Sequence, residues 1–240
     1  MMAGLFANQS ETLRELLGLS APAIAITFSQ SRPETVPDFP GTAPAAVDGG
    51  RTGKVPAGCV FWGKANGGTF TTQPADHANC NVGSYTHGLK TLEEAAQGSD
   101  VAMLLDSGWV TADAVPSIPQ VSERFSYITY GPLAEATAAP DVVLLHLNPK
   151  QTMLMSDGIP EMRIEGKPQC HIIAVAKEQN QVVASVGCML SRVRTGMSNN
   201  EMTCAIPGPI LAEVIARLSS AVQVDKTVAA YASQDSMRFK

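Results

Sequence analysis

The chain has 240 residues, of which 45% are hydrophobic, which is enough to bury a sizeable core in one domain or in two closely packed halves. It carries 17 Lys and Arg against 22 Asp and Glu, and this net charge of -5 argues against a nucleic-acid partner. The longest apolar runs, such as residues 22–28 and 142–147, are far shorter than the roughly 20 residues that cross a bilayer. We therefore expect a soluble protein without a membrane partner.

The first residues contain no basic segment followed by a sustained apolar run, so the sequence predicts no secretory signal and a cytoplasmic location. In that reducing compartment the five cysteines are not expected to form stable disulfides. They are then free thiols, catalytic groups or metal ligands, which makes them the main candidates for chemistry.

The first half of the chain predicts a helix, then strands separated by irregular segments. Ser10 is a candidate N-cap of an amphipathic helix that ends at Gly18. Residues 22–28 are apolar and β-branched, which is typical of a buried strand. Residues 31–56 are rich in Pro, Gly, Thr and Asp and predict a long irregular arm or lid. After it we expect a helix over 59–66, a strand over 69–72, a turn-rich loop around Cys80, partial helix over 91–105 and a strand over 125–130.

The second half predicts a similar mixture of elements. We expect a buried strand over 141–147, a helix after Asn148-Pro149 through Met155, a helix from Cys170 to about Lys177, a strand over 181–186, and two final helices over 209–218 and 225–232. These elements predict an α/β (α+β) fold, a mixed sheet with flanking helices, in a single compact domain over residues 1–240.

The two halves follow one plan: an apolar strand, a Cys at a helix start, another strand and a second Cys. The spacing from Cys59 to Cys80 resembles the spacing from Cys170 to Cys188. We therefore predict an internal duplication of residues 20–130 and 131–220. A pseudo-twofold between the halves would bring two pairs of thiols to one seam.

Cys59, Cys80, Cys170 and Cys188 are the predicted metal ligands. Thiolates select iron–sulfur clusters and zinc, and four of them are the usual complement of a 4Fe-4S cluster or a closed zinc site. A Cys at a helix start also faces partly positive amides, which favour the thiolate. The chain contains no CxxC pair, so the alternative is that these cysteines are small core residues. Cys204, in a strand-like apolar run, is assigned to the core.

Short motifs along most of the chain resemble those of a known protein family. They are residues 22–28, 59–65, 80–83 with 88–89, 131–133, 141–143, 148–151, Cys170, Gly187-Cys188 with Arg192, and 201–202 with 206–207. Together they resemble the uncharacterised ArCR family, domain of unknown function 169, from Leu13 to about Leu218. The resemblance implies a common fold and places the four predicted ligands in a shared pattern, but it implies no activity.

Two basic residues are candidates for cofactor binding. Arg192 follows Cys188 and is suited to hold an anionic ligand or to offset the charge of a thiolate cluster. Lys150 follows Asn148-Pro149 at a strand-to-helix junction, where α/β proteins often bind ligands. The plainer roles are a surface ion pair for Arg192 and helix capping for Asn148.

The histidines are further candidates for metal ligation or proton transfer. His77, His87 and His171 lie close to predicted ligand cysteines in the sequence, although most loop histidines are simply solvated. His146 lies in an apolar strand and is assigned to a satisfied core or strand-end position. Trp62 is a candidate pocket wall, with an ordinary core role as the alternative.

The leading hypothesis is an iron–sulfur protein for electron transfer or reductive chemistry, an oxidoreductase acting with a small molecule or a redox partner protein. One alternative is a zinc-stabilised or metal-free module that binds a small ligand, gated by residues 31–56. The other is a thiol-dependent enzyme in which Cys80 or Cys188 is the nucleophile and a nearby His is its base. The sequence leaves open whether the chain forms a homo-oligomer.

Overall fold

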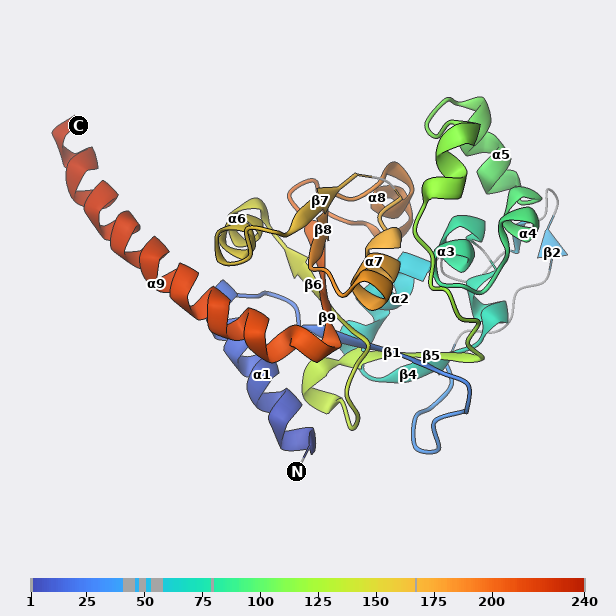
Figure 1. Cartoon of the computed structure of the whole chain (residues 1–240), viewed down its shortest axis with the longest axis horizontal. Helices are drawn as coiled ribbons and strands as arrows, with labels where there is room; N and C mark the ends of the chain where they lie inside the picture. The colour runs from blue at the N-terminus through green and yellow to red at the C-terminus, as the bar shows by residue number, and fades with distance from the viewer. Residues whose placement is uncertain are drawn as a thin grey trace.

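The computed structural model describes residues 2–40, 46–47, 51–52, 58–78, 80–166 and 168–239. Within them a seven-stranded mixed sheet lies between two layers of helices (Figure 1). Its strands, in spatial order, are β4 (Phe70–Thr72), β5 (Tyr127–Pro132), β1 (Ile24–Ser29), β6 (Val142–Leu147), β9 (Met202–Pro207), β8 (Val183–Ser185) and β7 (Arg163–Glu165). The predicted α+β class, a mixed sheet with flanking helices, is confirmed.

The middle of the sheet is the antiparallel pair β1 and β6, in which Ala25 is opposite Val143. Outward from this pair, β5 is antiparallel to β1 and β4 is antiparallel to β5. On the other side, β9 is antiparallel to β6 and β8 is antiparallel to β9, while β7 is parallel to β8. The order β1-β5-β4 thus matches the order β6-β9-β8, and the predicted internal duplication with its pseudo-twofold stays a prediction.

The alternation of side chains along β6 explains the two helical layers. Val143, Leu145 and Leu147 pack with α1 (Met2–Leu17), α6 (Pro149–Gly158) and α9 (Leu211–Ser236) on one face of the sheet. Val142 and Leu144 pack with α2 (Gly58–Lys64) and α7 (His171–Gln179) on the other face. His146 follows the second set along the strand, so it belongs to the α2 face.

Four further short helices complete the α2 face and its surroundings: α3 (Asn81–Thr86), α4 (Leu92–Ala96), α5 (Ser99–Asp106) and α8 (Met189–Thr195). The described residues also include short segments of 3₁₀ helix: η1 (Ala65–Gly67), η2 (Pro74–His77), η3 (Ala112–Ser117), η4 (Leu133–Glu135), η5 (Gly208–Ile210) and η6 (Met237–Phe239). The sequence predicted turns where α3 and α8 form, because the residue that caps each helix is a Cys rather than one of the usual capping residues.

The first helix is longer than predicted. It begins at Met2, so Ser10 lies within the helix instead of capping it. Its end is as expected, because Gly18 has a φ of 62° and the Leu19 amide donates back to the Arg14 carbonyl at 3.1 Å.

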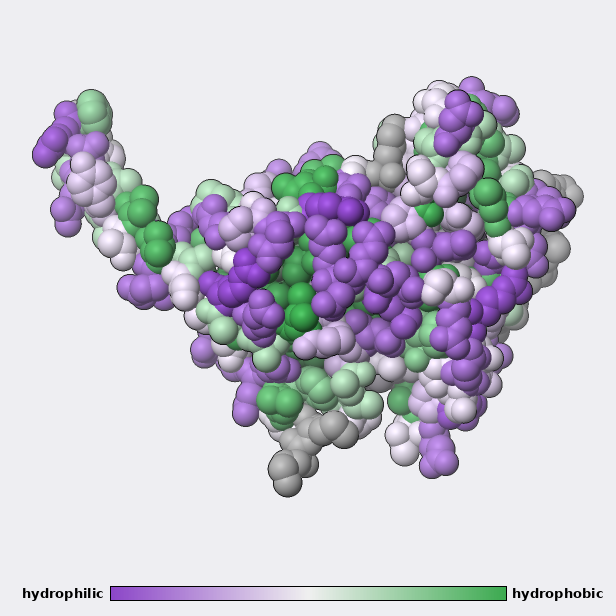
Figure 2. Space-filling model, in the orientation of Figure 1, coloured by the Kyte–Doolittle hydropathy of each residue, from purple (hydrophilic) through white to green (hydrophobic). Residues whose placement is uncertain are grey.

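The last helix, α9, is one continuous element of 26 residues, whereas two helices were predicted. No Gly or Pro interrupts residues 211–236, so nothing in the sequence breaks the helix. Its buried side chains end at Val222, and beyond that point the helix extends away from the sheet (Figure 1). Apolar side chains lie among polar ones on this projecting end (Figure 2).

The segment 31–56, predicted as an irregular arm or lid, is described in part. Its beginning runs beside β4: the Phe39 amide donates to the Thr71 carbonyl at 2.7 Å, and the Thr71 amide donates to the Pro37 carbonyl at 2.8 Å. The Phe39 ring packs against Phe61 and Phe70 at centroid distances of 5.0 and 5.1 Å. Farther on, β2 (Ala46–Val47) pairs with β3 (Arg51–Thr52). Residues 41–45, 48–50 and 53–56 lie outside the described residues, and the lid role stays a prediction.

Candidate functional site

A cavity of about 470 Å³ lies at the carboxyl end of β6. It is bordered by α2, by the start of α6 and by the segment 195–201 that leads into β9. The residues in its wall that concern the site most are Cys59, Trp62, His146, Gln151, Gln169 and Glu201. Small-molecule sites are usually cavities of this size with a few polar groups in the wall, so this cavity is the candidate functional site.

His146 and Glu201 form a hydrogen-bonded pair in the cavity wall. His146 Nδ1 lies 2.7 Å from Glu201 Oε1, and the Ser198 amide donates to Glu201 Oε2 at 3.2 Å. Because a carboxylate accepts hydrogen bonds, His146 Nδ1 is the donor to Glu201. His146 Nε2 is buried and has no hydrogen-bond partner among the described residues.

Trp62 supplies a complementary group to the same wall. Its side chain is 1% exposed, and Nε1 has no acceptor in the described part of the chain. Leaving a buried donor without a partner costs about 1–3 kcal/mol. Trp62 and His146 thus each contribute to the wall while burying one polar atom without a partner among the described residues.

The wall is braced by amide side chains that are fully used within the protein. Gln151 donates from Nε2 to the carbonyls of Leu17 and Gly18 at 3.0 and 3.1 Å. The backbone N–H of Gln151 donates to Asn148 Oδ1 at 2.9 Å, which confirms that Asn148 caps α6. These bonds fix the start of α6 against the end of α1, and they hold this side of the cavity in place.

A second brace joins the cavity to α8. Gln169 donates from Nε2 to Thr203 Oγ1 at 3.1 Å and accepts at Oε1 from Ser191 Oγ at 2.5 Å. Ser191 Oγ also accepts from the Cys188 amide at 3.2 Å. Gln169 is thus a fixed part of the wall.

Arg192, a predicted cofactor-binding residue, is not among the residues of this wall. Its guanidinium donates to the carbonyls of Val186 at 2.6 Å and Glu201 at 3.3 Å, and it also bonds the Ser198 carbonyl. It therefore holds the segment that carries Glu201. A role for Arg192 in cofactor binding stays a prediction.

Lys150, the other predicted cofactor-binding residue, pairs with Asp225 on α9. Its side chain is 54% exposed, and it lies outside the cavity wall although its neighbours Asn148 and Gln151 are part of it. Its predicted cofactor role likewise stays a prediction.

The predicted four-thiolate metalloprotein is wrong. Among the residues that the structure describes, which include all five cysteines, no group of three or more His, Cys, Asp or Glu side chains is placed to hold a metal ion. The hypothesis of an iron–sulfur oxidoreductase, which rested on that ligand group, therefore loses its basis. The four cysteines have other roles.

Two of these cysteines cap helices. Cys80 Sγ accepts from the Gly83 amide at 3.3 Å at the start of α3, and Cys188 Sγ accepts from the Ser191 amide at 3.3 Å at the start of α8. The sequence predicted that backbone amides turn toward these sulfurs, and this contact is confirmed, although helices rather than flexible turns supply the amides.

The predicted ligand cysteines also border one narrow apolar cavity of about 20 Å³, together with Val82, Leu104 and Pro168. Burial raises the pKa of the Cys170 thiol well above its ordinary value, and the neighbouring Cys80 acts in the same direction. A thiol in this setting stays protonated and neutral. The cavity is a gap in the core of the α2 face, shared by thiols that do not form a ligand group.

Cys204 lies on the opposite face of the sheet, fully buried in the core with α1, α6 and α9. Burial raises the pKa of this thiol to about 12. Its assignment to the core is confirmed.

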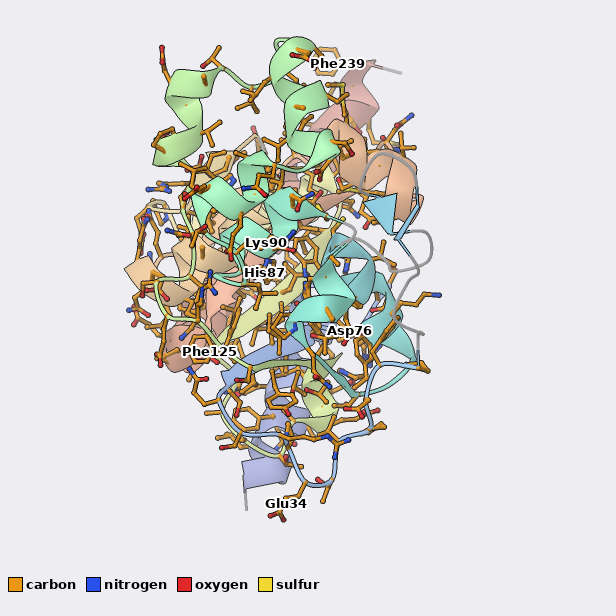
Figure 3. The ribbon with its side chains drawn as sticks, turned by 90° about the vertical axis from the view of Figure 1, so that its right-hand side faces the viewer. Glu34, Asp76, His87, Lys90, Phe125 and Phe239 are labelled. Atoms are coloured by element: carbon orange, nitrogen blue, oxygen red, sulfur yellow. The ribbon has the colours of Figure 1, made fainter. Side chains whose placement is uncertain are left out.

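His77 and His87 are buried rather than solvated. His77 Nε2 lies 3.0 Å from Thr72 Oγ1, and His87 Nδ1 donates to the Gly83 carbonyl at 2.8 Å. Burial lowers the pKa of both, that of His87 to about 4. His87 lies near the middle of the molecule in Figure 3. Neutral imidazoles packed at 5.8 Å from each other are parts of the core.

His171 is also buried, and Nδ1 bonds the Pro168 carbonyl at the start of α7. Burial lowers the pKa of this side chain.

The sequence did not single out Glu201 as a site residue, and it did not predict the role of His146 beside it. Glu201 is 55 positions from His146 along the chain, so no local spacing connects them.

One family of proteins matches most of the chain. The family model of the uncharacterised ArCR proteins, domain of unknown function 169, matches residues 12–217. The chain therefore belongs to this family. No curated protein and no solved structure matches the chain. In the described part of the chain, every helix is too short or too polar to cross a membrane.

Proposed function

We propose that this protein binds a small molecule in the cavity at the end of β6. The observation that carries the proposal is the cavity of about 470 Å³ with the hydrogen-bonded pair of His146 and Glu201 in its wall. The Glu201 side chain is 29% exposed, so its carboxylate oxygens are accessible. They are acceptors for a bound molecule that carries a hydrogen-bond donor.

The size and construction of the cavity also support binding. Its volume of about 470 Å³ falls in the usual range for small-molecule sites. The wall is held by side chains from distant parts of the chain, since Gln151 bonds the end of α1 and Gln169 bonds β9. A wall fixed in this way loses little conformational entropy when a ligand binds.

The two tryptophans of the chain allow a direct test. Trp109 borders other cavities, so a Trp109→Phe variant leaves Trp62 as the single reporter at the candidate site. Its fluorescence would be titrated with a panel of small amines, alcohols and carboxylic acids. We expect at least one class to change the emission of Trp62 in a saturable way.

A matched pair of variants then tests the accessible acceptor. Glu201→Gln keeps the shape of the side chain but removes its charge, and calorimetry should show about threefold to tenfold weaker binding of the molecule found in the titration. Glu213→Gln, at an exposed position outside the cavity wall, should bind it like the unmodified chain. Equal affinity of the two variants, or no binding by any class, contradicts the proposal.

A further inference from the structure

We infer that a second cavity binds a small aromatic molecule that carries a hydrogen-bond donor, such as a phenol. This cavity has a volume of about 440 Å³ and lies between residues 108–119 and the segment from Glu165 to His171. None of the described residues that border it also borders the cavity at the end of β6. The inference therefore concerns a separate site and does not rest on the proposed function.

The first argument is the apolar part of the wall. Trp109 and Ile118 border the cavity and are partly exposed, and the ring of Pro119 belongs to the same wall. An indole attracts a second aromatic ring more strongly than the buried apolar area alone accounts for, through offset stacking or edge-to-face contact. This part of the wall therefore favours a flat aromatic ring over an open apolar chain.

The second argument is the packing around Trp109. Trp109 and Pro168 also border two narrow apolar cavities of about 30 and 20 Å³. Protein interiors are close-packed, so an indole that borders three cavities is uncommon. The gaps give Trp109 room to shift against an incoming ring without overpacking the core.

The third argument is a pair of acceptors beside these rings. Ser117 is exposed and donates its hydroxyl proton to the Ala114 carbonyl at 2.7 Å, so lone pairs on Oγ remain available. Glu165 is paired with Arg163 at 2.9 Å, but its side chain is 32% exposed and a carboxylate has about four lone-pair positions. A donor on the ligand complements these acceptors. A phenol combines that donor with the aromatic ring.

Three compounds of similar size test the two parts of this inference: para-cresol, its methyl ether and para-methylcyclohexanol. The ether keeps the aromatic ring without the donor, and the cyclohexanol keeps the donor without the aromatic ring. Calorimetry with the unmodified protein should show para-cresol binding about threefold or more tighter than either of the others.

Variants of Trp109 test the location. Trp109→Phe keeps an aromatic ring and should bind para-cresol within about twofold of the unmodified chain, whereas Trp109→Ala should bind it about fivefold or more weakly. Para-cresol should also change the tryptophan emission of the unmodified protein. Because Trp62 is the one tryptophan left in Trp109→Phe, that change should be absent from this variant.

A double variant tests the acceptors. In Ser117→Ala with Glu165→Met, the affinity for para-cresol should fall to within about twofold of that for its methyl ether. The matched control is Ser236→Ala with Glu213→Met on α9. Ser236 makes the same type of bond, to the Ser233 carbonyl at 2.9 Å, and both positions are exposed and do not border the cavity. This control should keep the preference for para-cresol.

The outcomes separate this inference from the proposed function. Equal affinity for para-cresol and either analogue, or no binding of para-cresol, overturns the inference. An emission change that persists in Trp109→Phe also overturns it, because it places the molecule at Trp62. The ranking of the three compounds needs no variant, so it decides the ligand class even where the double variant fails to fold. Each of these results leaves the test of the cavity at the end of β6 unaffected.

Discussion

The half of the sheet with β1, β5 and β4 has the same strand order as the half with β6, β9 and β8. In each half a Cys side chain caps a short helix at the same point along the chain. Cys80 caps α3, which follows β4, and Cys188 caps α8, which follows β8. The polar residues inside the two halves differ. The first contains His77 and His87 sealed in an aromatic core, and the second contains His146 beside a cavity.

The difference lies in the partner that each histidine has. His77 and His87 are paired with a hydroxyl and a carbonyl, and burial without a counter-charge keeps them neutral. His146 is partly exposed and has the Glu201 carboxylate at 2.7 Å. Similar strand frameworks thus bury a histidine pair in one half and place His146 beside a cavity in the other, because the residues around the frame differ. The wall of that cavity also includes α2 of the first half.

The largest expected effect is a difference in stability between two glycine substitutions, one near the end of β5 and one directly after β9. A Cβ on Gly208 would lie 1.8 Å from the Pro140 carbonyl oxygen, which is backbone and cannot move aside, whereas a Cβ on Gly131 would meet the Thr69 side chain. We expect Gly208→Ala to lower the free energy of unfolding by about 3 kcal/mol or more and Gly131→Ala by about 1 kcal/mol. Urea denaturation measures both, and equal losses would contradict the distinction.

Acid should destabilise the half with the buried histidines. The pKa of His87 is lowered by burial from 6.5 to about 4, so between these values the unfolded chain binds more protons than the folded one. The free energy of unfolding should therefore fall as pH falls through this window, by about 3 kcal/mol from His87 alone.

The measurement compares the unmodified chain with His87→Gln by urea denaturation at several pH values between neutral and about pH 4. The variant removes the titrating group, so its loss of stability with acid should be smaller. Parallel curves for the two proteins would show that His87 does not contribute.

The two cysteine caps should have similar effects. Each sulfur accepts one helix amide at 3.3 Å, so Cys80→Ala and Cys188→Ala should each cost about 1 kcal/mol, the usual value of an N-cap bond. Cys→Ser at either position keeps an acceptor and should cost less. Thermal melts of the four variants check this, and a loss at only one position would argue that the two halves do not use their caps alike.

The smallest effect is expected at Lys150. Its ion pair with Asp225 joins α6 to α9 but is half exposed, so Lys150→Met should change the free energy of unfolding by no more than about 0.5 kcal/mol. The same denaturation experiment measures it. A change well above 1 kcal/mol would show that the attachment of α9 depends on this pair.

Local patterns predicted much of the fold. The apolar runs around Ile24 and Val143 became the central strands, Gly18 ended the first helix, and Asn148 capped α6. The patterns failed at α3 and α8, where turns were predicted, and at α9, where two helices were predicted instead of one. Capping by sulfur and the continuity of a helix without Gly or Pro were both readable in principle, from backbone chemistry rather than from hydropathy.

The sequence by itself determined the class of the fold, the family and the burial of Cys204, because hydrophobic periodicity and short motifs are local properties. Only the tertiary structure decided what the polar residues do. It showed that the thiols near one cavity do not form a metal-ligand group, and that His146 meets Glu201. Those outcomes depend on side-chain positions set by strand pairing between distant segments, and sequence spacing carries no information about them.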